Sequence, residues 1–297
     1  MANRSRRRFD DDSTPTRARP PTVAADSDVR LDDPGDDEPT WSSYPEATHG
    51  PAPRPPWVIT SPAAIDTDLG VVKSGKEADV SLVRRELDGH VTLLAAKQYR
   101  DAHHRLFHRD AGYLEGRQVR RSRENRAMAT RTDFGRDLIA GQWAAAEFAV
   151  LSRLWTAGAA VPYPVQLSGT ELMMEFIGDH DRHGHGAAAP RLAQLRPDRR
   201  QADRWYRQLG DVLVALVDAG YAHGDLSAYN ILVHHNCLVL IDLPQAVDLV
   251  GNPQGFEYLR RDCVNICGWF AARGVQADPD RLQQDLLRGL PRLDGSE

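Results

Sequence analysis

The segment YAHGDLSAYNILV, residues 221–233, places an aspartate and an asparagine five positions apart, between an expected helix end and an apolar strand. At this spacing Asp225 could accept the proton of a hydroxyl group, and the amide oxygen of Asn230 could ligate a magnesium ion. A second carboxylate, Asp242, follows the apolar stretch CLVLI. Because Mg²⁺ binds few protein carboxylates and completes its shell with phosphate oxygens and water, Asn230 and Asp242 suffice as ligands beside a nucleotide.

A lysine and a glutamate upstream could bind the phosphates of that nucleotide. Lys97 lies near the end of the expected strand HVTLLAAKQYR, residues 90–100, in a context similar to the V-A-I-K motif. Residues 137–156 are expected to form a helix, and its apolar stripe includes Glu147. Since a carboxylate on an apolar face is costly unless a cation pairs with it, we expect Glu147 to bind Lys97.

Lysine is rare in this chain. Of 37 basic residues, all are arginine except Lys73, Lys76 and Lys97. Arginine replaces lysine on most solvated surfaces without penalty, so a lysine that persists indicates a need for a compact ammonium group. Lys76 belongs to the turn SGKEADV, residues 74–80, whose glycine could expose backbone N–H groups to a phosphate. The turn is not a Walker A loop, because it lacks the GxxxxGK[ST] spacing before a helix.

The triplet Asp133-Phe134-Gly135 has the composition of a kinase metal-binding loop, but it stands in the wrong place. It lies 92 residues before Asp225 and ahead of the helix that carries Glu147, whereas a metal-binding aspartate must follow the catalytic loop. We therefore expect the triplet to be a turn that leads into the helix. The aspartate that holds the metal is expected to be Asp242.

The apolar periodicity predicts a small antiparallel sheet followed by a helical region. Asp88-Gly89 between two apolar runs is a strong hairpin signal. Few residues separate Asp242 from the last expected helix, so an activation segment of the usual length cannot fit, and a substrate would be recognised elsewhere. The expected strands are residues 68–74, 78–87 and 90–100, two short strands within 163–178, and the pair ILVH and CLVLI; the later helices are 198–219, with Asp198 as N-cap and Gly220 as terminator, and one that begins near Pro253.

The chain is expected to have three parts. Residues 1–60 are rich in proline and acidic residues and almost lack a periodic apolar pattern, so a disordered tail is expected there. Residues 61–178 and 179–297 are expected to form the N-lobe and the C-lobe of a two-lobed α+β fold. An arginine-dense stretch at about residues 101–136 is expected to be a flexible loop, which could contact RNA or substrate phosphates or simply be solvated.

The composition argues against several classes of protein. A formal net charge of −5 is unlike that of a generally basic nucleic-acid binder. No run of 18 apolar residues and no apolar N-terminal region occur, so a soluble, cytoplasmic protein without membrane contact is expected. Three cysteines, Cys237, Cys263 and Cys267, are too few for a disulfide framework or a structural zinc site. Histidines at positions 180, 183 and 185 could bind a metal, but a flexible histidine-rich loop is favoured.

In this order the motifs resemble those of the RIO kinases, atypical serine/threonine protein kinases, over roughly residues 60–275. The matching strings are SGKEADV, MMEFIG, HGDLSAYNIL, IDLPQAVD and EYLRRDCVNI. The resemblance implies a protein-kinase-like fold, ATP and Mg²⁺ as cofactors, and transfer of the γ-phosphoryl group to Ser/Thr hydroxyls, including autophosphorylation. It also implies a phosphoaspartate at Asp242 and hence ATPase turnover.

Carried over by position, the resemblance implies a role for each site residue. Asp225 would be the catalytic base, and Asn230 and Asp242 the metal ligands. The nucleotide-binding residues would be Ser74, Gly75, Lys76, Glu77, Ala78 and Val80 in the turn, Lys97 and Glu147 as the phosphate pair, and Glu175 and Ile177 at the hinge. Two alternatives stay open: a small-molecule phosphotransferase of the aminoglycoside or choline kinase type, and a nucleotide-responsive RNA- or ribosome-binding scaffold.

Overall fold

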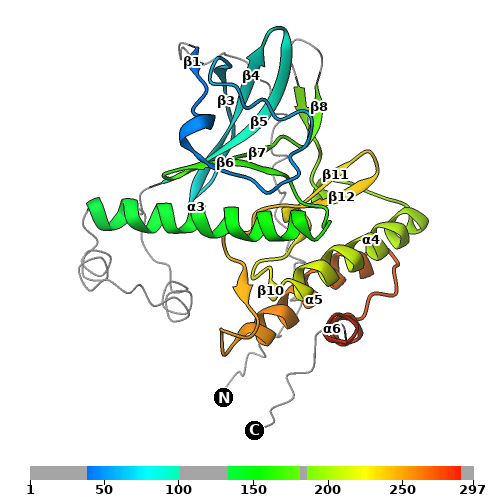
Figure 1. The fold of residues 1–297 in the computed structure, drawn as a ribbon. Helices are drawn as coiled ribbons and strands as arrows, with labels where there is room; N and C mark the ends of the chain where they lie inside the picture. Colours follow the sequence, from blue (N-terminus) through cyan, green and yellow to red (C-terminus); the bar gives the residue numbers. More distant parts are fainter. Residues whose placement is uncertain (1–38, 101–132, 181–185, 289–297) are drawn as a thin grey trace, which may run out of the picture. The chain divides into compact units, whose positions relative to one another are not determined.

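The computed structural model of the 297-residue chain describes residues 39–100, 133–180 and 186–288. The chain divides into two compact units, Met1–Arg30 and Leu31–Glu297. The first unit lies outside the described residues, so everything below concerns the second. As the sequence predicts, this unit has an α+β fold, with an antiparallel sheet and one long helix followed by a mainly helical lobe (Figure 1).

The N-lobe is built on a seven-stranded antiparallel sheet with the strand order β1-β3-β4-β5-β7-β6-β2. Asp88 and Gly89 join β4 to β5 with φ angles of 49° and 80°, the left-handed conformations that a two-residue hairpin requires and that Asp-Gly favours. The strands are β1 Thr40–Trp41, β2 Thr48–His49, β3 Ile65–Ser74, β4 Ala78–Leu87, β5 His90–Tyr99, β6 Pro164–Ser168 and β7 Glu171–Glu175.

One long helix, α3 (Asp133–Thr156), packs against β5, β6 and β7. The C-lobe contains the helices α4 (Arg199–Asp218), α5 (Gly255–Ala271) and α6 (Pro279–Leu287). Asp198 caps α4 by accepting from the amide of Gln201, as the sequence predicts. The short strands are β8 Gly178–His180, β9 Gly186–Ala188, β10 Tyr221–Ala222, β11 Ile231–His234, β12 Cys237–Leu240 and β13 Val247–Asp248, and the 3₁₀ turns are η1 Tyr44–Glu46, η2 Leu192–Gln194 and η3 Ala228–Asn230.

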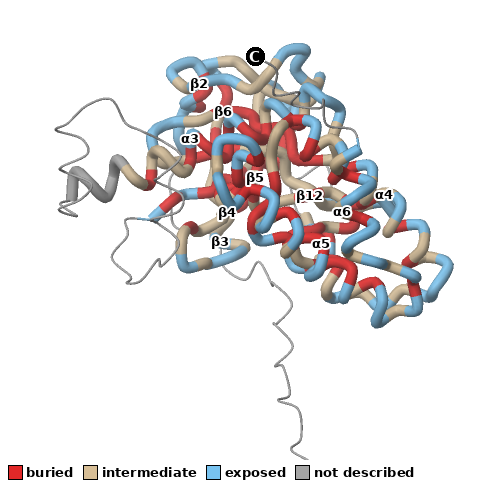
Figure 2. Tube along the Cα trace, turned by 90° about the horizontal axis from the view of Figure 1, so that it is seen from below, coloured by how far each residue is buried: buried red, intermediate tan, exposed pale blue. Residues whose placement is uncertain are grey.

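The core of the C-lobe is a single apolar cluster that extends to α3. Figure 2 shows the buried positions concentrated where α4 and α5 face the rest of the lobe. The helical periodicity of apolar residues on α4 predicts a buried face. The structure buries the expected side chains, Trp205, Leu209, Val212, Leu213, Leu216 and Val217. Cys263 and Cys267 are buried free thiols in this cluster, and Cys237 is an exposed one.

The expectation of a disordered tail up to residue 60 is wrong for residues 40–60. Residues 40–49, which we call the N-terminal strap, pair with both edges of the sheet: Thr40 lies opposite Asp66 on β3, and Thr48 lies opposite Leu167 on β6. The two strap strands are only two residues long, and their order comes from tertiary contacts rather than from a periodic pattern. Tyr44, between them, is buried in the N-lobe core.

The strap requires the sheet to curl. In a flat sheet of this strand order, β1 and β2 would be about 29 Å apart, since neighbouring strands are about 4.8 Å apart. The seven Cα steps from Trp41 to Thr48 span at most about 25 Å even when fully extended, and the η1 turn shortens that reach. The two edges must therefore approach each other, so the sheet is curled rather than flat.

An ion pair lies inside this curled sheet. Arg85 on β4 is 1% exposed, and its Nε and Nη2 atoms each donate to a carboxylate oxygen of Asp66 at 2.7 Å. Nη2 also donates to Gln166 at 3.0 Å, and the ring of Tyr44 lies 5.9 Å from the guanidinium carbon. A buried guanidinium is tolerable because its donors and its charge are matched in this bidentate geometry.

Two further expectations need correction. Asp133-Phe134-Gly135 is not a turn before the helix but the first turn of α3 itself. The arginine-dense stretch expected to be a loop over about residues 101–136 lies outside the described residues up to residue 132, and residues 133–136 are helical. Among the described helices, none is both long and apolar enough to cross a membrane.

The buried ion pair gives a test of the curled sheet. Asp66→Ala leaves Arg85 charged and unpaired, so we expect the free energy of unfolding to fall by about 3–5 kcal/mol. The matched control is Glu86→Ala, which breaks the exposed Arg84–Glu86 pair at 3.8 Å on the same strand and should cost at most about 1 kcal/mol. Denaturant unfolding measures both. Equal losses in the two variants would contradict a sealed pair beneath the strap.

Candidate active site

The register of the sheet places two lysines on one face. Val80 on β4 lies opposite Lys73 on β3 and opposite Lys97 on β5. Residues directly opposite one another in antiparallel strands point to the same face, so both ammonium groups extend from the sheet in the same direction. Both reach Asp242, which lies 145 positions beyond Lys97 in the sequence. Strands β3 and β5 therefore each supply one lysine to the same carboxylate of the C-lobe.

Lys97 is the centre of this site. Its Nζ atom lies 3.0 and 2.9 Å from the two carboxylate oxygens of Glu147 and 2.7 Å from Oδ1 of Asp242. Burial alone would lower the pKa of Lys97, but the two carboxylates outweigh it and raise that pKa above its ordinary value. The predicted pairing of the strand lysine with the helix glutamate is present, and the lysine joins the two lobes as well.

Glu147 is 1% exposed, and both oxygens of its carboxylate accept hydrogen bonds. Besides Lys97 it accepts from the amide of Leu243 at 2.9 Å and from the hydroxyl of Tyr99. Burial and the adjacent carboxylate raise the pKa of Tyr99 well above its ordinary value, so this hydroxyl stays a donor. Because Leu243 directly follows Asp242, Glu147 holds the backbone next to Asp242 as well as the ammonium group of Lys97.

Asp242 has a left-handed backbone, with φ at 66°, and its side chain remains 32% exposed. Burial would raise its pKa, but Lys97 and then Lys73, whose Nζ is 3.7 Å from Oδ2, hold the pKa well below the usual range. The carboxylate is therefore ionised at neutral pH, as a metal ligand must be. Each of its two oxygens faces a different lysine.

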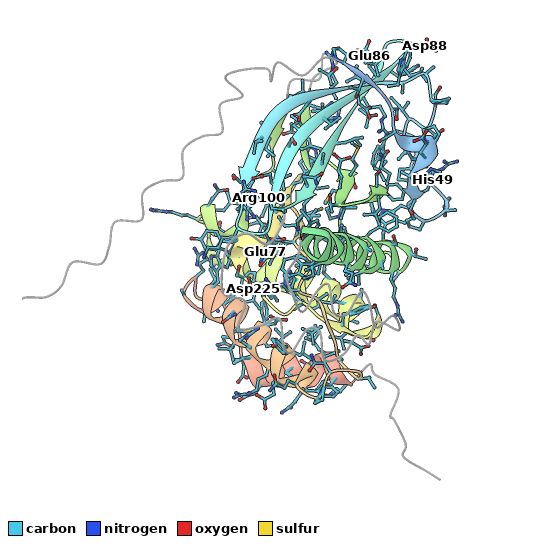
Figure 3. All side chains as sticks on the ribbon, turned by 90° about the vertical axis from the view of Figure 1, so that its left-hand side faces the viewer. His49, Glu77, Glu86, Asp88, Arg100 and Asp225 are labelled. Carbon is cyan, nitrogen blue, oxygen red and sulfur yellow. The ribbon has the colours of Figure 1, made fainter. Side chains whose placement is uncertain are left out.

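The turn between β3 and β4 closes over this cluster from the N-lobe side. Gly75 N donates to the carbonyl of Ala78 at 2.9 Å, and Ala78 itself is buried. Glu77 accepts from the side chain of Gln245 at 3.1 Å, and burial together with Asp242 raises its pKa. Figure 3 shows Glu77 at the end of the sheet that faces Asp225. The turn thus contacts the C-lobe at Gln245, three residues after the expected metal ligand Asp242.

Two members of the turn are turned away from this contact. The hydroxyl of Ser74 donates to Asp79 at 2.7 Å and accepts from Arg100 at 2.7 Å, on the exposed side. Lys76 is exposed at the tip. If Ser74 contacts a phosphate in this arrangement, it does so through its backbone amide rather than its hydroxyl.

The loop at residues 223–226, which contains the expected base Asp225, is held by hydrogen bonds to two other segments of the C-lobe. The imidazole of His223, fully buried, lies 3.1 Å through Nε2 from the carbonyl of Ile241, and its Nδ1 accepts from the amide of Asp225 at 3.3 Å. These two bonds assign the tautomer with the proton on Nε2. Gly224 has φ at 81°, and a Cβ there would lie 2.3 Å from the carbonyl of Gln245, so only glycine fits.

Asp262 on α5 anchors the same loop from below. It is 2% exposed and accepts from the amides of Gly224 at 2.8 Å and Leu226 at 2.9 Å, one on each carboxylate oxygen. Burial raises its pKa, while His223 and the two amides act in the opposite direction. Asp225, between the two anchored amides, is exposed, and Figure 3 shows it near Glu77 of the turn.

Asn230 and Asp242 suit a magnesium ion. The side-chain nitrogen of Asn230 donates to the carbonyl of Asp225 at 2.9 Å, which leaves its amide oxygen facing the other way. The backbone of Asn230 accepts from the amide of Ile241 at 3.0 Å, so Asn230 lies beside the residue that precedes Asp242. A carboxylate and an amide oxygen are hard donors that Mg²⁺ accepts, with phosphate oxygens and water to complete the shell.

The expected hinge contacts lie where β7 ends. The side chain of Glu175 accepts from the amide of Tyr163 at 3.1 Å, and burial raises the pKa of Glu175. The carbonyl of Ile177 already accepts from the amide of Ala189 at 2.9 Å. An adenine contact from Ile177 would therefore use its amide rather than its carbonyl.

Sequence reasoning missed four residues of the site: Lys73, Tyr99, Gln245 and Asp262. The rarity of lysine singles out Lys73, but nothing in the sequence gives it a partner. Tyr99 lies two residues after Lys97, on the same face of β5, a spacing that could have suggested it. Gln245 and Asp262 lie within the matching strings IDLPQAVD and EYLRRDCVNI, but their partners are in distant segments that no local pattern identifies.

Asp262 gives the test of this geometry. Asp262→Ala leaves two buried amides without an acceptor, so we expect the free energy of unfolding to fall by roughly 2–4 kcal/mol. Asp262→Asn keeps one acceptor oxygen and should lose less. The matched control is Asn265→Ala, an exposed position on the same helix, which should change stability by no more than about 0.5 kcal/mol. An Ala variant as stable as that control would show that the loop does not depend on this anchor.

Solved structures support the fold. A crystal structure of the Rio2 kinase–ADP/Mg²⁺–phosphoaspartate complex from Chaetomium thermophilum aligns with a TM-score of 0.55 and 21% identity, over 77% of this chain and 62% of that one. A second structure of the Rio2 kinase from the same organism gives a TM-score of 0.55 and 23% identity. At this level of identity the likeness shows the two-lobed fold.

Sequence relatives show the family. The RIO-type serine/threonine-protein kinase Rio1 of Haloferax volcanii is 36% identical over 220 residues, 74% of this chain and 69% of the relative. The serine/threonine-protein kinase RIO1 of Chaetomium thermophilum is 32% identical over 71% of this chain but only 41% of its own length. The model of the RIO domain matches residues 95–282, a span that begins just before Lys97 and includes Glu147, Asp225, Asn230 and Asp242. This chain therefore belongs to the RIO family.

Proposed function

We propose that this protein is an ATP- and magnesium-dependent serine/threonine protein kinase of the RIO type, which also phosphorylates itself. The observation that carries the proposal is the Lys97 ammonium group, bound at once to Glu147 of α3 and to Asp242 of the C-lobe. These contacts hold the proposed phosphate-binding lysine next to the proposed metal-binding aspartate, which supports phosphoryl transfer at this place. The family relatives, which are protein kinases by name, support the same activity.

The residues divide the work of the transfer. Lys97, fixed by Glu147, would bind the α- and β-phosphates, and the amide of Ile177 would bind the adenine edge. A Ser/Thr hydroxyl would attack the γ-phosphorus, a new oxygen–phosphorus bond would form, and the bond from the γ-phosphorus to the bridging oxygen of ADP would break. Asp225 would accept the hydroxyl proton. Magnesium held by Asn230 and Asp242 would neutralise the charge on the phosphates.

The path from Asp242 to α5 supports a site that needs no activation-loop phosphorylation. Residues 243–254 contain only the two-residue strand β13, which pairs with β10, before α5 begins at Gly255. The amide of Leu243 is bound by Glu147, so the segment is held from its first residue. Substrate would therefore be bound by surfaces outside this segment, and the site would be formed constitutively.

Two alternatives make different predictions for the same assay. A small-molecule phosphotransferase, which shares the HGDL-x3-N pattern, would label aminoglycosides or choline but no protein. A nucleotide-responsive scaffold would bind ATP with little transfer. RNA or ribosomal contact through the arginine-dense segment, and a cytoplasmic location, belong to the proposal as well.

Asp225 gives the direct test. Asp225→Ala removes the proton acceptor, so incorporation of labelled phosphate into Ser/Thr, in the protein itself and in a generic acceptor protein, should fall by about 10²–10⁴-fold. ATP affinity should stay within a few-fold, because Asp225 does not bind the nucleotide phosphates in the proposed arrangement. The matched control is Asp211→Ala, an exposed aspartate on α4. Full activity in the Asp225 variant would contradict the role of Asp225 as the proton acceptor.

A second candidate activity is ATP hydrolysis through a phosphoaspartate. The related Rio2 structure contains ADP, Mg²⁺ and phosphoaspartate. In this chain Asp242 is ionised, about a third exposed and positioned beside two lysines that could stabilise developing negative charge. Its carboxylate oxygen would attack the γ-phosphorus with release of ADP, and water would then hydrolyse the acyl phosphate to free phosphate.

Chemical lability separates the two activities. If Asp242 is phosphorylated, part of the label on the wild-type protein should be removed by hydroxylamine, which cleaves acyl phosphates and leaves phosphoserine intact. Asp242→Asn should lose that labile fraction, whereas Asp225→Ala should retain it, since attack by a carboxylate needs no base. Label that resists hydroxylamine entirely would rule out the phosphoaspartate but not the kinase.

A further inference from the structure

Outside the active site, three side chains that can ligate a metal meet on one surface of the C-lobe. Oδ1 of Asp179 lies 3.2 Å from Nε2 of His234 and 3.4 Å from Nε2 of His235, and all three ligand atoms are within 4.8 Å of one another. Asp179 and His235 are 78% and 74% exposed at the side chain, and His234 is 26% exposed. The cluster is therefore open to solvent on one side.

The spacing of these atoms is that of adjacent ligands around a tetrahedral ion. With bonds of about 2.0–2.2 Å to nitrogen and oxygen, neighbouring ligand atoms of a tetrahedral zinc site are about 3.4 Å apart. The two separations from Asp179, 3.2 and 3.4 Å, agree with that edge length. The two imidazole nitrogens are within 4.8 Å of each other, so the three atoms can surround one ion, and water could take the fourth, solvent-facing position.

The cluster is held in place by its surroundings. His235 and Asn236 form the turn between β11 and β12, with φ angles of 46° and 67°. Helix α4 fixes this turn, since Gln201 donates to Oδ1 of Asn236 at 2.7 Å and Trp205 donates to its carbonyl at 3.3 Å. Asp179 belongs to β8, where it lies opposite Ala187 of β9. The ligands therefore come from two antiparallel strand pairs, and α4 holds the turn that carries His235.

The donor set selects the kind of ion. Imidazole nitrogen suits zinc and neighbouring transition metals, whereas magnesium and calcium prefer oxygen donors. One carboxylate and two imidazoles leave an open position, which is typical of a zinc site that binds water or a further ligand. This chemistry differs from that of the Asn230–Asp242 site, so the two sites should discriminate between zinc and magnesium.

The position of the cluster links two parts of the active site. Asp179 is two residues beyond the hinge residue Ile177, and His234 is the last residue of β11, which starts immediately after Asn230. An ion bound here would cross-link the hairpin that follows the hinge to the hairpin that follows the catalytic loop. The expectation of a histidine-rich loop without metal concerned His180, which is not among these three ligands, and His183 and His185, which lie outside the described residues.

We propose that Asp179, His234 and His235 form a surface site for a zinc-class divalent cation, which ties the hinge hairpin to the catalytic-loop hairpin. The site is independent of the proposed kinase activity, because its ligands take no part in phosphoryl transfer. A cation there stabilises the folded state in proportion to its occupancy, since the ligands converge only when the two hairpins are in place.

The experiment uses the full chain, stripped of metal with a chelator and kept in millimolar Mg²⁺ to occupy the Asn230–Asp242 site. Zinc is titrated against a competing chromophoric chelator, and Co²⁺ absorption in the visible range reports tetrahedral coordination. The wild type should bind one zinc ion that Asp179→Asn and His235→Ala bind at least about tenfold more weakly. Zinc at about a hundred times the wild-type Kd should raise the Tm by roughly 5 °C in the wild type and by at most about half as much in the two variants.

His90→Ala is the matched control, because His90 is an exposed histidine in the β4–β5 hairpin. It should bind zinc as the wild type does. Both test variants alter exposed side chains, so a folding defect is not expected, and their unfolding curves without zinc provide the check. Absence of zinc binding by the wild type at 100-fold excess over protein, or equal stoichiometry and affinity in the wild type and both variants, would overturn the proposal.

Discussion

The arrangement of the active site depends on one ammonium group, that of Lys97. It is buried, which is costly for an isolated charge, and its position is tolerable only because two carboxylates converge on it from different parts of the chain. Glu147 comes from α3 and Asp242 from the loop after β12, so the two lobes meet through this charge. Removing either carboxylate would leave a buried cation with incomplete compensation, and the fold is therefore constrained to keep both close to the lysine.

The same constraint extends to the catalytic loop through the backbone. Glu147 binds the amide of Leu243, the residue after Asp242, while His223 contacts the carbonyl of Ile241, the residue before it. His223 in turn accepts from the amide of Asp225. The expected base, metal ligand and phosphate-binding lysine thus belong to one network of polar groups, and each of these groups has a partner. This network supports the proposal that the site forms without phosphorylation of an activation loop.

The sequence predicts those features that depend on local chemistry. The Asp-Gly hairpin, the Asp198 cap, the bounds of β4 and the burial of Glu147 follow from turn preference, capping and periodicity, and the structure has all four. It does not predict the N-terminal strap, because two-residue strands carry no periodic signal and are ordered only by the distant edges they join. Lys73 and Asp262 are missed for a similar reason, since each acts on a residue far away in the chain. The triplet Asp133-Phe134-Gly135 shows the opposite case, because it matches a metal-binding motif but lies in the wrong part of the fold. A short motif is informative only when its place in the fold is correct.

The two lysines around Asp242 have consequences for how metal and nucleotide bind. Oδ1 of Asp242 is 2.7 Å from Lys97, and Oδ2 is 3.7 Å from Lys73, so both oxygens are near a cation. Lys97 is buried and also bound by Glu147, whereas Lys73 has a longer contact and a side chain that is 43% exposed. In the proposed mechanism, a magnesium ion at Oδ2 would be repelled by the ammonium group of Lys73 unless a phosphate oxygen accepted that group. Nucleotide phosphates would therefore strengthen magnesium binding at Asp242, with Lys73 passing from the carboxylate to a phosphate oxygen.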